Sequence, residues 1–114
     1  MTFYINEVDT EESDWEHECI GLFSEANWIG EGNFCGWYGA EFYTNTTLIA
    51  YGIQLGHSNM YNPKRPFNGG FKVVNKYYDK IAIGSSYWTK RFEADSVEEA
   101  IRIFKNQEWE KYDR

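Results

Sequence analysis

The hydrophobic positions near the start of the chain follow two different patterns. Residues 3–8 (Phe-Tyr-Ile-Asn-Glu-Val) have the length and composition of a short strand. Ser13 and Glu16 then form a capping box, which is typical of a helix start. Apolar residues recur at helical spacing after it: Trp15, Cys19, Leu22, Phe23 and Ala26. The pattern predicts a helix over about 14–27 whose Trp15 face packs in the core.

Between Trp28 and Arg91 the apolar residues are mainly β-branched or aromatic, and Gly, Asn and Pro interrupt them. This composition predicts strands at 34–43, 48–55, 71–77 and 81–92. Residues 44–47 (Thr-Asn-Thr-Thr) and 78–80 (Tyr-Asp-Lys) have the composition of turns. The stretch 56–70 contains Pro63 and Pro66, so we expect a surface loop there.

The end of the chain repeats the helical signature of the start. Ser96 and Glu99 form a second capping box, and apolar residues with helical spacing predict a helix over about 96–106. The order strand, helix, four strands, helix favours an α+β fold, a single antiparallel β-sheet of about five strands with two helices packed on one face. We expect residues 1–114 to form a single globular domain, because no repeat or linker divides them.

Charge is distributed unevenly along the chain. The first basic residue is Lys64, and ten carboxylates precede it, so residues 1–63 carry a net charge of −10 with histidine neutral. The remaining residues carry +3, which gives the total of −7. Such an uneven charge distribution gives information about the binding partners of a protein and not about its fold. The 22 aromatic residues exclude a disordered acidic tail. We therefore expect a folded acidic surface that meets a cationic partner.

The predicted helix over 14–27 places acidic residues on the face opposite Trp15. Residues four apart on a helix are separated by about 6 Å along its axis, which is close to the spacing of phosphates on a nucleic-acid strand. Our hypothesis is that Glu11, Asp14, Glu18 and Glu25 imitate a phosphate backbone. The alternative is that these carboxylates only favour the helix dipole and solubility.

A second candidate surface is the glycine-rich aromatic run at 32–39. Trp37 and Tyr38 lie in it, and Glu31 borders it. Aromatic anchors rimmed by charge are typical of protein interfaces. The alternative is an ordinary aromatic core. The candidate partner-binding residues are therefore Glu11, Asp14, Glu18, Glu25, Glu31, Trp37 and Tyr38.

The region 64–91 is basic, with only Asp79 opposing its cations. They are Lys64, Arg65, Lys72, Lys76, Lys80, Lys90 and Arg91. Aromatic residues between them resemble a nucleic-acid-binding sheet in composition. Another use is electrostatic complementarity with the acidic half, either within the fold or between copies in a homodimer.

Catalytic and metal-binding signatures are weak. His17 and Cys19 are two positions apart, so on a helix they point in different directions, and Cys19 is expected to be a buried, inert thiol. Cys35 and His57 are isolated and lack the paired spacing of zinc sites. We expect no enzymatic activity, no metal and no cofactor. The lack of a signal-peptide pattern and of an 18-residue apolar run predicts a cytoplasmic protein without membrane contact.

These observations favour a small acidic cytoplasmic protein that inhibits a larger, basic, nucleic-acid-binding protein by covering its basic surface. A phage protein acting on a nuclease or on a CRISPR- or restriction-type defence effector in the host cytoplasm fits this description. An immunity protein for a nuclease toxin is the alternative. A nucleic-acid-binding module that uses the basic 64–91 region is less favoured, because a net charge of −7 opposes nucleic-acid binding.

Overall fold

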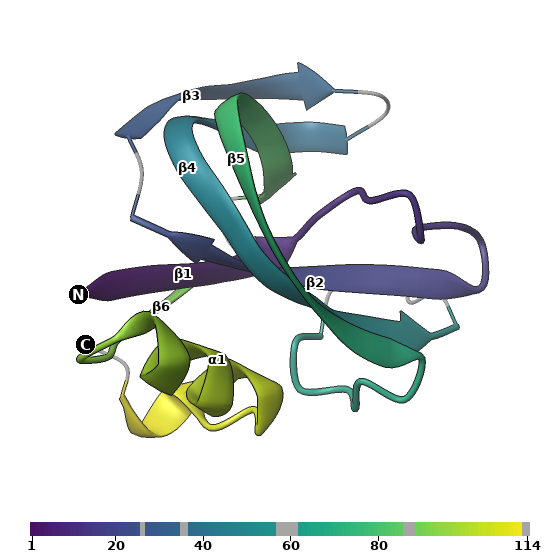
Figure 1. Ribbon diagram of the computed structural model, residues 1–114. Helices are drawn as coiled ribbons and strands as arrows, with labels where there is room; N and C mark the ends of the chain where they lie inside the picture. Colours follow the sequence, from purple (N-terminus) through teal and green to yellow (C-terminus); the bar gives the residue numbers. More distant parts are fainter. Residues whose placement is uncertain (26, 35–36, 57–61, 86–88, 113–114) are drawn as a thin grey trace.

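The computed structural model describes residues 1–25, 27–34, 37–56, 62–85 and 89–112 (Figure 1). Its strands are β1 (Thr2–Glu7), β2 (His17–Ser24), β3 (Asn27–Phe34), β4 (Trp37–Leu55), β5 (Gly70–Ser85) and β6 (Lys90–Glu93). A helix, α1 (Val97–Lys105), and a 3-10 turn, η2 (Trp109–Lys111), follow. Neither of these two helical segments has the length and apolar content that crossing a membrane requires.

The six strands form one antiparallel sheet built around the long strand β4. The strand order is β3-β4-β2-β1-β6, and β5 pairs with the other edge of β4. Along one edge, the first part of β4 pairs with β3 and the last part with β2. The sheet curls strongly, so that β3 and the first part of β4 fold over the rest of it (Figure 1). The architecture is a curled antiparallel half-barrel.

The α+β arrangement with two helices on one sheet face is therefore wrong. Residues predicted as a helix over 14–27 form β2 and the start of β3. Both faces of β2 are buried, because its residues from Glu18 to Phe23 are buried without exception. A strand covered on both faces shows no alternation of polar and apolar residues, and its apolar residues happened to match the helical period. Trp15, which the helix would have buried, is 83% exposed.

The turns predicted at 44–47 and 78–80 are also wrong, because both lie within continuous strands. Thr44 is paired with Lys80 and Thr46 with Tyr78, so the two segments lie opposite each other in the β4–β5 ladder. Asn45 has φ of 55°, a left-handed conformation that asparagine tolerates. The polar residues lie in the curled part of this two-stranded ribbon (Figure 1) and do not reverse the chain.

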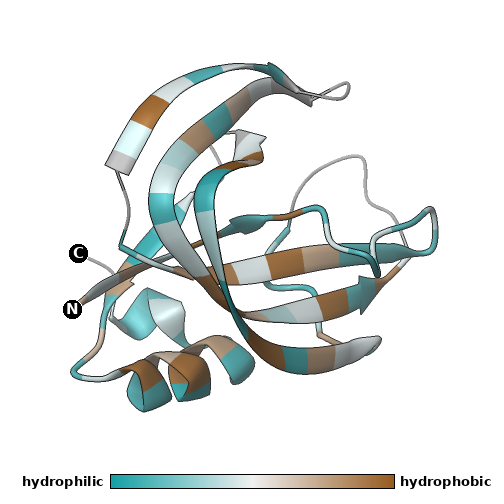
Figure 2. Ribbon diagram, turned by 45° about the horizontal axis from the view of Figure 1, so that its top comes forward, coloured by the Kyte–Doolittle hydropathy of each residue, from teal (hydrophilic) through white to brown (hydrophobic). Residues whose placement is uncertain are grey.

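Two hydrophobic clusters lie on opposite faces of the sheet. Alternate residues of β1 contribute to each: Phe3 and Ile5 join the cluster that α1 covers, and Tyr4 joins the cluster inside the curl. From α1, Ala100, Ile103 and Phe104 join the first cluster, together with the buried Trp109 of η2. Brown apolar segments of α1 are visible in Figure 2. The packing of α1 on the sheet makes this helix part of the core.

The prediction of a helix over 96–106 is confirmed within one residue at each end. Ser96 is its N-cap, and the Ser96 hydroxyl accepts a hydrogen bond from the Glu99 backbone N–H at 3.1 Å. The strand predicted at 3–8 is confirmed as β1. Of the two helices predicted from the sequence, only the one over 96–106 is therefore present in the structure.

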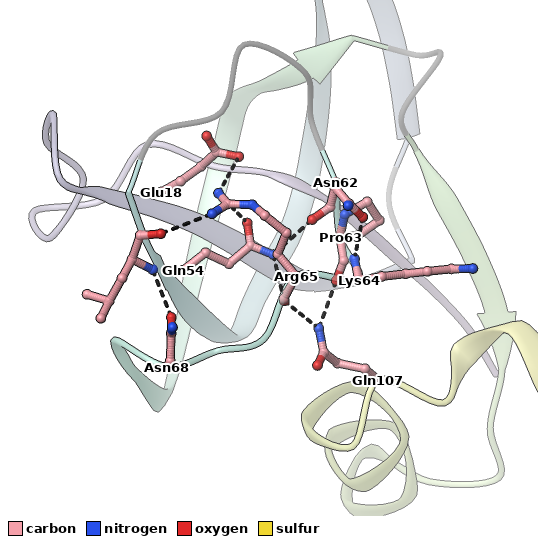
Figure 3. A network of polar contacts seen from close by, with 9 residues as sticks. Glu18, Gln54, Asn62, Pro63, Lys64, Arg65, Asn68 and Gln107 are labelled. Carbon is pink, nitrogen blue, oxygen red and sulfur yellow. Dashed lines mark hydrogen bonds and ion pairs between the residues drawn. The ribbon is translucent and has the colours of Figure 1, made fainter.

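The loop predicted at 56–70 is confirmed for residues 62–69, while 57–61 lie outside the described residues. Two glutamine side chains anchor it (Figure 3). Gln54 of β4 donates to the carbonyls of Asn62 and Arg65, both at 2.9 Å. Gln107, which follows α1, donates to the carbonyls of Pro63 and Arg65 at 2.9 and 2.8 Å. This loop is therefore tied to both the sheet and the helical segment.

Candidate partner-binding surface

The connection between β1 and β2 contains half of the carboxylates that precede Lys64. We call residues 9–16 the acidic turn. Its acidic residues are Asp9, Glu11, Glu12, Asp14 and Glu16, and it contains no basic residue. Five carboxylates in eight residues make it the densest concentration of negative charge in the chain.

Local hydrogen bonds give the acidic turn a defined shape. Ser13 N–H donates to the Thr10 carbonyl at 3.0 Å, and Thr10 N–H donates to the Ser13 hydroxyl at 2.9 Å. The backbones of Asp14 and His17 exchange hydrogen bonds of 3.1 and 3.4 Å. Gly56 N–H, at the end of β4, donates to the Glu16 carbonyl at 2.7 Å. A backbone fixed in this way loses less entropy when a partner binds.

Trp15 and Glu16 are the central residues of the tight turn that Asp14 and His17 close. The Trp15 side chain is 83% exposed. Leu55 of β4 pairs with His17 and is 47% exposed. An exposed tryptophan flanked in sequence by carboxylates combines the aromatic anchor and the charged rim of a protein interface.

Asp14 supports the shape of the turn as well as its charge. Its Oδ1 accepts a hydrogen bond from Glu16 N–H at 2.7 Å and lies 2.7 Å from His17 Nδ1. The hydrogen bonds from the His17 side chain and from the Glu16 backbone lower the pKa of Asp14. The Asp14 carboxylate therefore stays charged over the whole physiological pH range.

Glu12 is a member of the acidic turn whose charge is matched within the fold. It forms an ion pair with Lys72 of β5. The hydrogen bond to Glu12 raises the pKa of Lys72, so the Lys72 ammonium group remains charged at neutral pH. Asp9, Glu11 and Glu16 are exposed. The turn thus presents a negative surface to solvent after this internal pairing.

Glu18 lies at the base of the acidic turn, with only 2% of its side chain exposed. Its Oε1 is 3.7 Å from Nη2 of Arg65, which also donates to Gln54 Oε1 (Figure 3). Burial, followed by the neighbouring Glu18, raises the pKa of Glu7 to about 7. Glu18, which we expected at the surface, therefore supports the turn from inside.

The other predicted site residues lie elsewhere. Glu25, between β2 and β3, and Glu31, in β3, are both exposed. Strand β3 pairs with the first part of β4. Trp28 of the same strand is 56% exposed. Trp37 and Tyr38 open β4, and their side chains lie outside the described part of the structure. Of the predicted set, the structure brings only Glu11 and Asp14 together in the acidic turn, so the carboxylates form no helical stripe.

The basic region is partly neutralised within the fold. Three of its cations form ion pairs: Lys64 with Glu110, Arg65 with Glu18, and Lys72 with Glu12. Phe67 and Phe71 pack against Phe104 of α1, with ring centroids 5.2 and 5.8 Å away. These rings are part of the packing against the helix and are not arranged as a platform for stacking bases.

Cys19 is buried, as expected, although it lies in a strand. Its Sγ is 3.2 Å from the Thr10 hydroxyl, and burial raises the pKa of the thiol, which keeps it protonated. Within the described ranges, no group of three or more His, Cys, Asp or Glu side chains is placed to hold a metal ion. Cys35 and His57 lie outside those ranges.

The chain matches no protein-family model, no curated protein and no solved structure with which it was compared. Sequence reasoning missed two features of the acidic turn: the exposure of Trp15 and the burial of Glu18. The exposure of Trp15 could have been predicted from its position between the acidic residues Asp14 and Glu16. That position is more typical of an exposed turn than of a core helix.

Proposed function

We propose that this chain is a small acidic cytoplasmic protein that inhibits a larger nucleic-acid-binding protein by covering its basic surface. The acidic turn is the contact surface, and the protein acts by binding, without catalysis or a cofactor. The single observation that carries the proposal is an ordered turn of five carboxylates that holds Trp15 83% exposed. The partner is a nuclease or a CRISPR- or restriction-type defence effector.

Two physical contributions support this assignment. Exposed carboxylates attract a basic surface over a distance of about 8–10 Å at moderate salt, which accelerates association. A tryptophan that becomes buried on binding contributes about 2 kcal/mol or more and prolongs the complex. Because residues 17–24 form the strand β2 where a helix was predicted, the proposal rests on local charge and on Trp15, without a carboxylate ladder at phosphate spacing.

The immunity protein of a nuclease toxin has the same contact chemistry and remains the alternative. The gene neighbourhood separates the two, since an immunity gene lies beside its toxin gene. A module that binds nucleic acid through residues 64–91 is disfavoured by the internal ion pairs of Arg65 and Lys72. A homodimer stays a prediction, which the molar mass in solution tests.

The test is affinity capture from a lysate of the native host, followed by competition. The captured protein is purified and bound to labelled duplex DNA or RNA in a mobility-shift assay. The wild-type chain should release the nucleic acid, and the Glu11→Lys/Glu16→Lys variant should not. The proposal is contradicted if the captured protein has no affinity for nucleic acid, or if the variant competes as well as the wild type.

A further inference from the structure

A bulge in β3 brings Trp28 and Glu31 to the same face of the sheet. In a regular strand, residues three apart point to opposite faces. Trp28 pairs with Tyr43 of β4 and Glu31 pairs with Glu41, and the register shift between these pairs leaves Ile29 as an extra residue on β3. Tyr43 and Glu41 are two apart on β4, and the Tyr43 hydroxyl donates to Glu41 Oε2 at 3.1 Å. Trp28 and Glu31 therefore share the face of these two residues.

Both side chains are open to solvent. Trp28 is 56% exposed, Glu31 is exposed, and their strand lies at one end of the strand order. Among the residues that the structure describes, neither side chain has a hydrogen bond, an ion pair or a ring contact. Residues 25–34 contain the carboxylates of Glu25 and Glu31 and no basic residue. This edge thus presents an accessible indole and an accessible negative charge side by side.

The position of Glu31 opposite Glu41 favours a cation at this place. Like charges directly opposite each other in an antiparallel pair are destabilising. Glu41 is 4% exposed, and its Oε2 accepts hydrogen bonds from the hydroxyls of Tyr43 and Thr89 at 3.1 and 2.7 Å. Arg91 of β6 donates to the Tyr43 hydroxyl at 3.2 Å, so it reaches this network from β6. A cation beside Glu31 would offset the repulsion from the β3 side.

We propose that Trp28 and Glu31 bind an arginine side chain of a partner protein. The guanidinium plane stacks on the exposed indole, and its N–H groups donate to the Glu31 carboxylate. Arginine suits this pair better than lysine, because its group is flat, weakly hydrated and carries several donors in one plane. That the arginine belongs to the basic partner rests on the proposed function, whereas the preference of the site for arginine does not.

The test is an NMR titration of the isolated, nitrogen-15-labelled chain with N-acetyl-arginine amide at constant ionic strength. The reporters are the indole N–H of Trp28 and the backbone amide of Glu31. Exposed cation–π and ion-pair contacts together correspond to a dissociation constant of about 10–100 mM for this small probe. N-acetyl-citrulline amide has nearly the same shape without the charge and should cause no saturable shift. N-acetyl-lysine amide should bind at least about threefold more weakly than the arginine probe.

Variants whose folding is checked by circular dichroism assign the probe to this face. Glu31→Gln, and separately Trp28→Leu, should raise the dissociation constant at least about threefold. Glu31→Gln/Gly32→Glu keeps the net charge of −7 but moves the carboxylate to the opposite face, so it should bind as weakly as Glu31→Gln. Gly32 accepts a side chain, because an added Cβ meets only Phe42, at 3.7 Å. Glu25→Gln, the matched control, removes an exposed carboxylate outside the β3–β4 ladder and should stay within about twofold of wild type.

Three results would overturn the arginine site: equal shifts from the arginine and citrulline probes, the same dissociation constant for wild type and Glu31→Gln, or recovered binding in Glu31→Gln/Gly32→Glu. A single-stranded DNA hexamer that shifts the Trp28 indole at a lower concentration than the arginine probe would also overturn it, and would assign the surface to nucleic acid. The titration uses no partner protein, so its failure leaves the binding proposal intact, and failure of the capture experiment leaves the arginine site intact.

Discussion

The close approach of Phe67 to Gly52 gives a quantitative test of how the 62–69 loop and α1 pack on the sheet. A Cβ atom added at Gly52 would lie 2.3 Å from Phe67 Cγ and 2.4 and 2.5 Å from the two Cδ atoms. The ring cannot move away freely, because its centroid is 6.3 Å from that of Phe71 and 5.2 Å from that of Phe104. Gly52→Ala should therefore force overpacking.

Overpacking of this kind typically costs about 1–3 kcal/mol, and we expect about 2 kcal/mol for Gly52→Ala. In a Phe67→Ala background the added methyl group enters vacated space, so the same substitution should cost nearly nothing. The lower backbone entropy of alanine in the unfolded chain even favours it by about 0.5 kcal/mol. The double-mutant cycle should thus show a coupling of about 2 kcal/mol or more.

The assay is urea denaturation followed by circular dichroism on the two single variants, the double variant and the wild type at one pH. Gly32→Ala is the matched control, because a Cβ at Gly32 meets only Phe42, at an ordinary 3.7 Å. It should change the free energy of unfolding by less than about 0.5 kcal/mol. The packing account is refuted if Gly52→Ala is equally mild, or if its cost is the same with and without the Phe67 ring.

Three further substitutions test other parts of the fold. Ser96→Ala removes the N-cap of α1 and should lower the free energy of unfolding by about 1 kcal/mol in urea denaturation. Gln107→Ala leaves the carbonyls of Pro63 and Arg65 without these donors, and should cost about 1–3 kcal/mol. Cys19→Ala should cost about 1 kcal/mol through lost packing, yet leave partner affinity unchanged in calorimetry. An inactive but folded Cys19→Ala variant would contradict a purely binding role.

The correctness of the two helix predictions depended on how many faces of the element are buried. Helix α1 covers one face of the sheet, so its cap and its apolar stripe are both visible in the sequence. Strand β2 is buried on both faces, and its apolar run matches a helix as well as a strand. Gly21 lies in the middle of β2, where the side chains of its neighbours leave no room for a Cβ atom. A Cβ there would lie within 3.0 Å of Phe23, Leu48 and Val8.

Because β2 was predicted as a helix, the buried and exposed residues of the candidate site were also predicted the wrong way round. A helical period placed Trp15 in the core and Glu18 at the surface. The structure buries Glu18 and exposes Trp15. Composition assigned the excess negative charge to residues 1–63, because a charge count needs no assumption about the period, but it did not single out the turn at residues 9–16. The diagonal position of Glu18 relative to Glu7 depends on strand register, which no local pattern in this chain specifies.

The central claim, that the acidic turn is the contact surface, is tested most directly by two charge-matched variants. In the first, Asp9, Glu11 and Glu16 are replaced by lysine. In the second, the exposed residues Asp79, Asp95 and Glu98 are replaced by lysine. Each set changes the formal net charge from −7 to −1, so the two variants differ only in where the charge is reversed.

Titration calorimetry of both variants against the captured partner, after circular dichroism has confirmed folding, gives the decisive comparison. If each reversed contact costs about 1 kcal/mol, the acidic-turn variant should bind about 100-fold more weakly than wild type. The control variant should stay within about fivefold. Equal losses in the two variants would show that net charge alone drives binding, and an unchanged affinity of the acidic-turn variant would place the contact surface elsewhere on the protein.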